Sequence, residues 1–291
     1  MIQDFTYLRP GSLKEALAML AEHQDECKII CGGQSLLIVM RQGLVVTDYL
    51  LDIKNVSELR YITFDPKDGL KIGAATTHRE IEKSPVIMEM YPGLAAMETR
   101  LASIQVRNWG TIGGNLAHAD PSGDPGPVLM SMDASITVGS VRGERTMPLA
   151  EFFTDYFETA MEKDEMVLGI QIPVPEPRTA TAYRKFNLLD SDMGIAASAA
   201  SVTLNADGTC KKARIVLGNA APTPLRLKEA EEILTGKMLD DGLIEQAAKL
   251  AQEVSEPIAD IHASEEHRKH LLYVMTKRML KKACEEAKAQ G

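Results

Sequence analysis

Residues 111–124 read Thr-Ile-Gly-Gly-Asn-Leu-Ala-His-Ala-Asp-Pro-Ser-Gly-Asp, and this composition is poor material for a hydrophobic core. Gly113 and Gly114 lack a Cβ, so they can adopt positive φ and point successive N–H groups into one anion-binding concavity. Asn115 tolerates the same backbone region. The stretch therefore predicts a loop that approaches a phosphorylated ligand, with a tight turn between two strands as the alternative.

A second glycine pair follows an apolar stretch near the N-terminus. Residues 28–40 read Lys-Ile-Ile-Cys-Gly-Gly-Gln-Ser-Leu-Leu-Ile-Val-Met, which predicts a buried strand that delivers Gly32 and Gly33. Neither glycine pair matches the G-x-G-x-x-G or G-x-x-x-x-G-K-[ST] fingerprint. We therefore expect a phosphate site on a fold other than the common nucleotide-binding ones.

Composition narrows the class of protein. A chain of 291 residues with 45% hydrophobic and 25% charged residues is typical of a soluble globular protein with two domains. A net charge of −9 argues against a nucleic-acid surface. The four cysteines have no metal-ligand spacing, so we expect buried thiols, no metal site and a reducing, cytoplasmic compartment. The N-terminus has no signal-peptide pattern, and the uncharged run 29–40 is too short to span a membrane.

Capping boxes and turn residues place the elements of the first half. Ser12-x-x-Glu15 and Thr77-x-x-Glu80 predict two helix starts. The expected order is a helix over 12–22, strands at 28–31 and 48–53, a hairpin of 61–64 and 70–72, a helix from near 78, and helical turns over roughly 85–103.

The second half is predicted in the same way. We expect a helix over 127–132, a hairpin of 135–138 and 145–148, a buried strand over 166–172, an antiparallel sheet of 181–187, 196–204 and 212–218, and helices near 225–234, 240–254 and 264–289. The run Pro-Val-Pro-Glu-Pro at 173–177 interrupts regular structure. We place a domain boundary there, between residues 1–176 and 177–291.

The two glycine segments resemble a known family. Residues 30–36, residues 111–115 and Asp124 are similar to the FAD-binding medium subunit of the molybdenum hydroxylases, the carbon monoxide dehydrogenase and xanthine dehydrogenase family. The sequence of residues 117–121, Ala-His-Ala-Asp-Pro, is most similar to the carbon monoxide dehydrogenase branch of this family. The resemblance implies an α+β fold: a two-subdomain FAD-binding domain of the PCMH (vanillyl-alcohol oxidase-like) type, then a small antiparallel sheet with helices of the carbon monoxide dehydrogenase flavoprotein type.

The resemblance also implies a set of cofactor-binding residues and no catalytic or metal-binding ones. The backbone of Gly32–Leu36 would donate to the pyrophosphate, and the lysine of the first strand after the boundary would tune the flavin electrostatically. The set comprises Ile29, Ile30, Cys31, Gly32, Gly33, Gln34, Ser35, Leu36, Thr111, Gly113, Gly114, Asn115, Asp124, Leu168 and Lys185.

Several of these residues have an alternative structural role. Asp124 could serve only to cap the following helix, Lys185 could be an exposed strand residue, and Leu168 could be a core leucine. His118 and Asp120 form a general acid/base candidate, but a packed, hydrogen-bonding histidine is the commoner case.

Two departures from related flavoproteins carry information. Gln34 stands where relatives that tether FAD covalently place a histidine, so we expect non-covalent FAD. Leu188 and Leu189 replace an arginine expected near the flavin edge, which puts that contact in doubt.

By resemblance, the chain is the electron exit of a hetero-oligomer. A large molybdenum-cofactor subunit would oxidise the substrate, a small [2Fe–2S] subunit would carry the electrons, and the FAD of this chain would pass them to NAD⁺, a quinone or oxygen. Two alternatives stay open: a stand-alone flavin reductase of the same broad fold, and a non-enzymatic subunit that has lost FAD.

Overall fold

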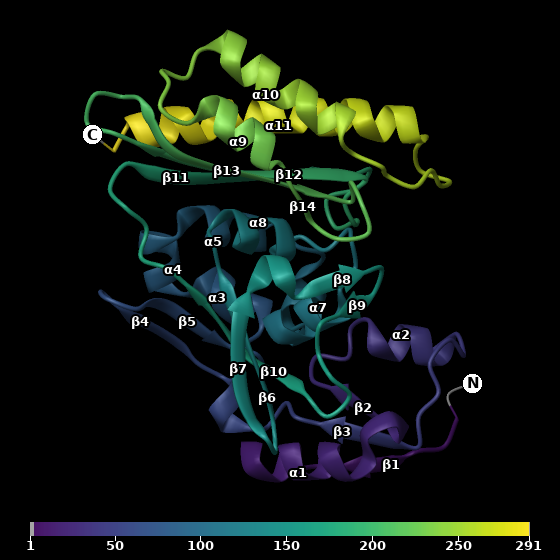
Figure 1. Ribbon diagram of the computed structural model, residues 1–291. Helices are drawn as coiled ribbons and strands as arrows, with labels where there is room; N and C mark the ends of the chain where they lie inside the picture. The colour runs from purple at the N-terminus through teal and green to yellow at the C-terminus, as the bar shows by residue number, and fades with distance from the viewer. Residues whose placement is uncertain (1–2, 291) are drawn as a thin grey trace.

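The computed structural model describes residues 3–290, and its N-terminal part contains two sheets (Figure 1). The first sheet is parallel and has the order β1-β3-β2, formed by β1 (Thr6–Leu8), β2 (Cys27–Ile30) and β3 (Tyr49–Asp52). Helix α1 (Leu13–His23) packs on it through Ala16 and Leu20, which share a buried cluster with Leu51. The predicted start of α1 is confirmed, since Ser12 Oγ accepts from the N–H of Glu15 at 3.2 Å.

The second sheet is antiparallel and has the order β4-β5-β10-β6-β7. Its strands are β4 (Ile62–Asp65), β5 (Gly69–Gly73), β6 (Ser135–Ser140), β7 (Gly143–Pro148) and β10 (Met166–Ile172). Central strand β10 is buried at every position except Gln171, because Ile170 and Ile172 pack in the cluster under the short helices, whereas Met166 and Leu168 pack with α1 and β3. Both predicted hairpins and the predicted buried strand are confirmed.

Short helices fill the space between this sheet and the C-terminal part of the chain (Figure 1). They are α3 (His78–Lys83), α4 (Pro85–Met90), α5 (Pro92–Glu98), α6 (Ile104–Trp109), α7 (Ile112–His118) and α8 (Pro125–Ser131). Helix α2 (Leu36–Arg41) lies beside β2 instead (Figure 1). The remaining elements are single 3₁₀ turns at Gln24–Glu26, Ser57–Leu59 and Leu149–Glu151 and the small ribbon β8 (Phe153–Asp155) and β9 (Glu158–Thr159). The capping box predicted at Thr77 is present in full and starts α3.

The C-terminal part is an antiparallel sheet with helices on its outer face. Its elements are β11 (Thr179–Phe186), β12 (Ala196–Leu204), β13 (Cys210–Gly218), β14 (Leu225–Arg226), α9 (Lys228–Leu234), α10 (Asp241–Glu253) and α11 (Glu265–Lys288). Every residue of β12 is buried, because α11 covers one face of the sheet and the N-terminal helices cover the other. The predicted α+β class, with a small sheet and helices after the larger part, is confirmed.

The two parts share one hydrophobic core. Tyr183, Ala199 and Val216 of the C-terminal sheet belong to the same buried cluster as residues of the five-stranded sheet and of α5 and α8. The proline-rich segment 173–177 lies between β10 and β11 without regular structure. The domain boundary after residue 176 stays a prediction.

Some elements differ from the sequence-based prediction. Residues 36–41 are helical, although their continuous apolar run gives no helical periodicity, and α6 lies beyond the predicted helical turns. Residues 225 and 226 pair with β13 as a short strand, so α9 starts at Lys228.

Candidate functional site

The first glycine segment is a loop that leads from β2 into α2. Gly33 has φ of 67°, and the Gln34 amide Nε2 donates to Gly32 O at 3.0 Å, so the loop folds back on itself. Within residues 3–290, the backbone N–H groups of Gly32–Leu36 donate to no protein acceptor. Successive N–H groups without a protein acceptor are what an anionic ligand needs, so this loop is the candidate for one.

This loop packs directly against the chain that precedes α7. A Cβ added at Gly32 would lie 2.3 Å from the carbonyl oxygen of Trp109 and 2.7 Å from Gly110 Cα, so only glycine fits there. Burial raises the pKa of the Cys31 thiol to about 11, although a hydrogen bond with the Thr111 side chain opposes that shift. The structure therefore brings together the two glycine segments that the sequence singled out.

The second glycine pair lies in a helix, and here the prediction of a positive-φ loop is wrong. Thr111 is the N-cap of α7, and its Oγ1 accepts from Gly114 N at 3.3 Å. Gly113 N donates to Ala74 O at 3.0 Å, and neither glycine has positive φ. The threonine cap and the neighbouring backbone use the N–H groups that were expected to point at an anion, so the N–H groups left without a protein acceptor are those of the first loop.

Glycine stands at positions 113 and 114 for two different physical reasons. A Cβ at Gly113 would lie 2.5 Å from the Ala74 Cβ, so this glycine permits close packing. A Cβ at Gly114 would meet only Thr111 Oγ1 at 2.9 Å within 4 Å, and Gly114 is exposed. Gly114 therefore keeps a surface of the site open, next to the partly buried Asn115 side chain.

Asp124 and Lys185 form a buried pair. Asp124 stands at the N-cap position of α8 but makes no capping hydrogen bond, so the capping role is wrong. Its carboxylate accepts from Tyr183 Oη at 2.5 Å and from Lys185 Nζ at 2.7 Å. Lys185 is 5% exposed, which excludes the exposed-strand role. Burial raises the pKa of Asp124, while Lys185 and Tyr183 oppose that shift.

A second buried pair, His78 with Glu98, was not expected from the sequence. His78 Nδ1 lies 3.0 Å from Glu98 Oε2, and both side chains are buried. The backbone N–H of His78 donates to Gly110 O at 3.0 Å, which fixes the chain segment that faces the first loop. The capping box at Thr77 predicts the helix, but no local pattern predicts a partner twenty residues away.

The remaining candidates lie where apolar packing dominates. Leu168 of β10 belongs to the buried cluster that also includes Ile29 and Cys31, and its carbonyl accepts from Ala74 N at 2.9 Å. It therefore lies behind the first loop as a core leucine. Ile30 ends β2 and is partly buried.

The other titratable candidates in residues 117–124 have structural roles. The ring of His118 packs at a tilt on Phe157, with 5.2 Å between ring centroids. The Asp120 carboxylate accepts from Ser122 N and Oγ at 2.9 and 2.6 Å, which closes the local turn. Leu188 and Leu189, at the position of the expected arginine, are exposed.

None of the helices in residues 3–290 is long and apolar enough to cross a membrane. Over the same residues, no group of three or more histidine, cysteine, aspartate or glutamate side chains could hold a metal ion.

Comparison with known proteins covers almost the whole chain. Residues 3–175 match the model of the FAD-binding domain in molybdopterin dehydrogenase, and residues 181–283 match the C-terminal domain of carbon monoxide dehydrogenase flavoprotein. The chain is 34% identical to the alpha subunit of the 6-hydroxypseudooxynicotine dehydrogenase complex of Paenarthrobacter nicotinovorans, over 98% of this chain and 96% of that one. It is 31% identical to the carbon monoxide dehydrogenase medium chain of Afipia carboxidovorans, over 99% and 98%.

Solved structures agree with the sequence comparisons. The carbon monoxide dehydrogenase of Hydrogenophaga pseudoflava, in a form that lacks the Mo-pyranopterin moiety of its cofactor, superimposes with a TM-score of 0.95 at 32% identity, covering 98% of this chain and 99% of that one. The chain combines the two matched regions with an unpaired run of loop donors suited to a diphosphate. It belongs to the FAD-binding subunits of the molybdenum hydroxylase dehydrogenases, and its cofactor is FAD.

Proposed function

We propose that this chain holds FAD non-covalently at the Gly32–Leu36 loop and forms the electron exit of a three-component complex. A large subunit with the molybdenum cofactor would oxidise the substrate, and a small [2Fe–2S] subunit would deliver the electrons. The observation that carries the proposal is the run of N–H groups in Gly32–Leu36 that donate to no acceptor in the described chain. Oriented backbone dipoles of this kind suit a diphosphate, because they need no added positive charge.

The residues around the loop fit the rest of a flavin nucleotide. The open side of Gly114 and the partly buried Asn115 amide would face the ribityl and diphosphate parts, beside the Thr111 hydroxyl. Gln34 carries an amide that hydrogen bonds within its own loop, so it offers no nucleophile for a covalent tether. FAD supplies the redox chemistry when bound, and the chain supplies donors, a fixed ion pair and exclusion of water.

Asp124 and Lys185 complete the proposed site on the side of the C-terminal sheet. Their pairing means that the flavin would meet a buried dipole and not an isolated cation. The final acceptor would take its electrons from the reduced flavin at the exposed edge, where Leu188 and Leu189 stand in place of a cation. This arrangement is compatible with NAD⁺, a quinone or oxygen as the acceptor.

The test is the visible absorption spectrum of the purified chain before and after acid precipitation. Flavin bands that pass into the supernatant are expected, because a non-covalent cofactor is released when the fold is lost. Bands that stay in the pellet would contradict the non-covalent mode. A colourless chain that fails to bind added FAD, alone and after co-purification with its partner subunits, would contradict the function.

A further inference from the structure

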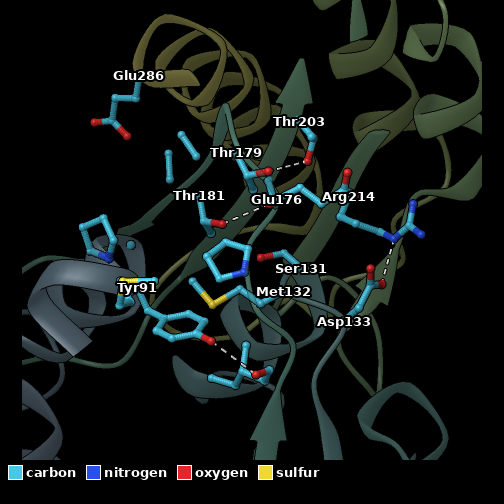
Figure 2. A pocket seen from close by; sticks show the side chains of 18 of the residues that line it. Tyr91, Ser131, Met132, Asp133, Glu176, Thr179, Thr181, Thr203, Arg214 and Glu286 are labelled. Atoms are coloured by element: carbon cyan, nitrogen blue, oxygen red, sulfur yellow. Dashed lines mark hydrogen bonds and ion pairs between the residues drawn. The ribbon is translucent and has the colours of Figure 1, made fainter. Parts of the chain in front are cut away.

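One cavity in the described chain lies away from the glycine loops, between the C-terminal sheet and helices α4, α5 and α8 (Figure 2). Its volume is about 530 Å³. Sites for small molecules have volumes of roughly 300–1,000 Å³ and combine an apolar lining with a few polar groups. The size is therefore right for a compound of one to three rings.

The inner face of the C-terminal sheet connects this cavity to the proposed cofactor site. Alternate residues of β11 share this face, and they run from the cavity toward Asp124 in the order Thr179, Thr181, Tyr183 and Lys185. The two threonines line the cavity, and Lys185 at the other end pairs with Asp124. Tyr183 lies between them and belongs to both places.

Tyr183 connects the cavity to Asp124. Its side chain lines the cavity, and its hydroxyl donates to Asp124 Oδ1 at 2.5 Å. The residue is only 8% exposed and packs in the shared core, so its ring cannot move without disturbing that hydrogen bond. A molecule that presses on the ring therefore acts on the carboxylate that also holds Lys185.

The polar wall of the cavity offers hydroxyl protons. Thr181 Oγ1 donates to Ser201 Oγ at 3.0 Å, which leaves the proton of Ser201 without an acceptor among the described residues. Thr179 and Thr203 share one hydrogen bond at 2.8 Å, which leaves one further hydroxyl proton (Figure 2). Both free protons suit a ligand with acceptor oxygens.

The opposite wall is apolar. It is formed by Met90, Tyr91, Met132, Pro173 and Pro175, with the Tyr91 hydroxyl donating outward to Pro173 O at 3.1 Å. Methionine side chains adapt their shape and make favourable sulfur contacts with aromatic rings. This wall therefore favours a planar ring.

The charges at the rim are balanced. Lys212 and Arg214 both pair with Asp133, at 2.5 and 2.8 Å, and Lys282 pairs with Glu286 at 3.6 Å. The lining residue Glu176 pairs with Lys211. No lining charge is left without a partner of the opposite sign, so the cavity has no electrostatic preference for an ion.

We propose that this cavity binds a neutral, planar ring compound with carbonyl oxygens, and that its occupancy is coupled to FAD binding through Tyr183. The coupling rests on the proposed cofactor site, whereas the binding does not. Coupling between two binding sites is reciprocal. The ring compound therefore changes the affinity for FAD by the same factor by which FAD changes the affinity for the ring compound.

Binding is tested with 2-quinolone, a bicyclic lactam, by calorimetric titration of the full chain. Ala96→Phe places a ring in the cavity from an exposed position on α5 and should weaken binding at least tenfold. Ala18→Phe, the same change at an exposed position of α1, should leave it unchanged. Ser201→Ala should weaken binding about tenfold through the lost donor. Naphthalene, which lacks the oxygen, should bind at least tenfold more weakly than 2-quinolone.

Coupling is tested by titrating the FAD-free chain with FAD in the presence and absence of saturating 2-quinolone. The FAD dissociation constant should change by about fivefold or more, and Tyr183→Phe, which keeps the ring but removes the hydroxyl, should abolish the change. No binding of 2-quinolone, or equal binding to the Ala96→Phe chain, would overturn the site. Unchanged FAD affinity would overturn the coupling. A chain that binds 2-quinolone but never FAD would overturn the proposed function and leave the cavity site standing.

Discussion

Lys185 Nζ lies 2.7 Å from Asp124 Oδ2, and this buried ion pair joins the C-terminal sheet to the start of α8. The two residues are separated by sixty-one positions in the chain. A buried pair is costly to break, because the remaining charge has no solvent and no partner. The pair therefore serves two purposes: it fixes the two parts of the chain against each other, and it sets the charge beside the proposed flavin.

Lys185→Met should lower the free energy of unfolding by about 3–5 kcal/mol at neutral pH, because Asp124 stays buried without its cation. Chemical denaturation followed by circular dichroism measures the change. Lys71→Met breaks the exposed pair with Asp68 and should cost no more than about 1 kcal/mol. Equal losses for the two variants would contradict the importance of burial.

The loss in Lys185→Met should also depend on pH. Burial raises the pKa of Asp124 in the folded chain, and removal of Lys185 takes away a group that lowers it. The folded state then binds more protons than the unfolded state, so stability falls as pH rises from about 4 through the folded pKa. Denaturation between pH 4 and 8 should show a loss that grows with pH. A loss that shrinks with rising pH would contradict this.

Lys185→Met should retain some FAD and lower its two-electron reduction potential by roughly 30 mV, the equivalent of about 1.4 kcal/mol. The reason is that reduction adds negative charge to the flavin, and the variant leaves an unpaired carboxylate nearby. A redox titration of the bound flavin measures the potential. Asp124→Asn should shift it in the opposite direction, and an unchanged potential in both variants would remove the tuning role.

Gly114→Val should abolish FAD binding while the chain remains folded, because the added side chain points into the open side of the site. The flavin-to-protein absorbance ratio measures the loss. Gly242→Val, in the first turn of α10, carries the same substitution in a helix away from the site and should keep full FAD content. Undiminished FAD in the Gly114→Val chain would falsify the assignment of this surface.

Gly113→Ala should behave differently from Gly114→Ala. Its Cβ would lie 2.5 Å from the Ala74 Cβ and 2.8 Å from the Ala74 carbonyl oxygen, so the backbone must shift. We expect a loss of about 1–3 kcal/mol of stability from overpacking. Gly114→Ala should cost less, because its Cβ would meet one side-chain atom, Thr111 Oγ1 at 2.9 Å, and no distant backbone. Thermal unfolding of both variants compares them directly, and the reverse order would contradict the assigned packing.

The Cys31 thiol should react slowly with iodoacetamide at pH 8. A pKa of about 11 leaves roughly one thiolate in a thousand at that pH. The alkylation rate, followed by mass spectrometry, should rise about tenfold per pH unit between pH 8 and 10. A rate that levels off near pH 9 would show an ordinary thiol.

Local chemistry in the sequence determined much of the fold. Ser12 and Thr77 start helices because each hydroxyl accepts a hydrogen bond from the N–H three residues later, which is a local contact. The proline run at 173–177 ends β10 because proline lacks the N–H that a strand needs. The first glycine loop was identified from its composition, and Gly33 has the positive φ that glycine allows.

The tertiary structure alone decided what the second glycine segment does and how the charged residues pair. The helix of residues 112–118 starts at the Thr111 cap, and the N–H of Gly113 donates to Ala74 O at the end of a distant strand, where only glycine lets that backbone approach. Asp124 meets Lys185, and His78 meets Glu98, only because sheets and helices far apart in the chain pack together. Burial and pairing depend on every element around a side chain, and no local pattern of residues encodes them.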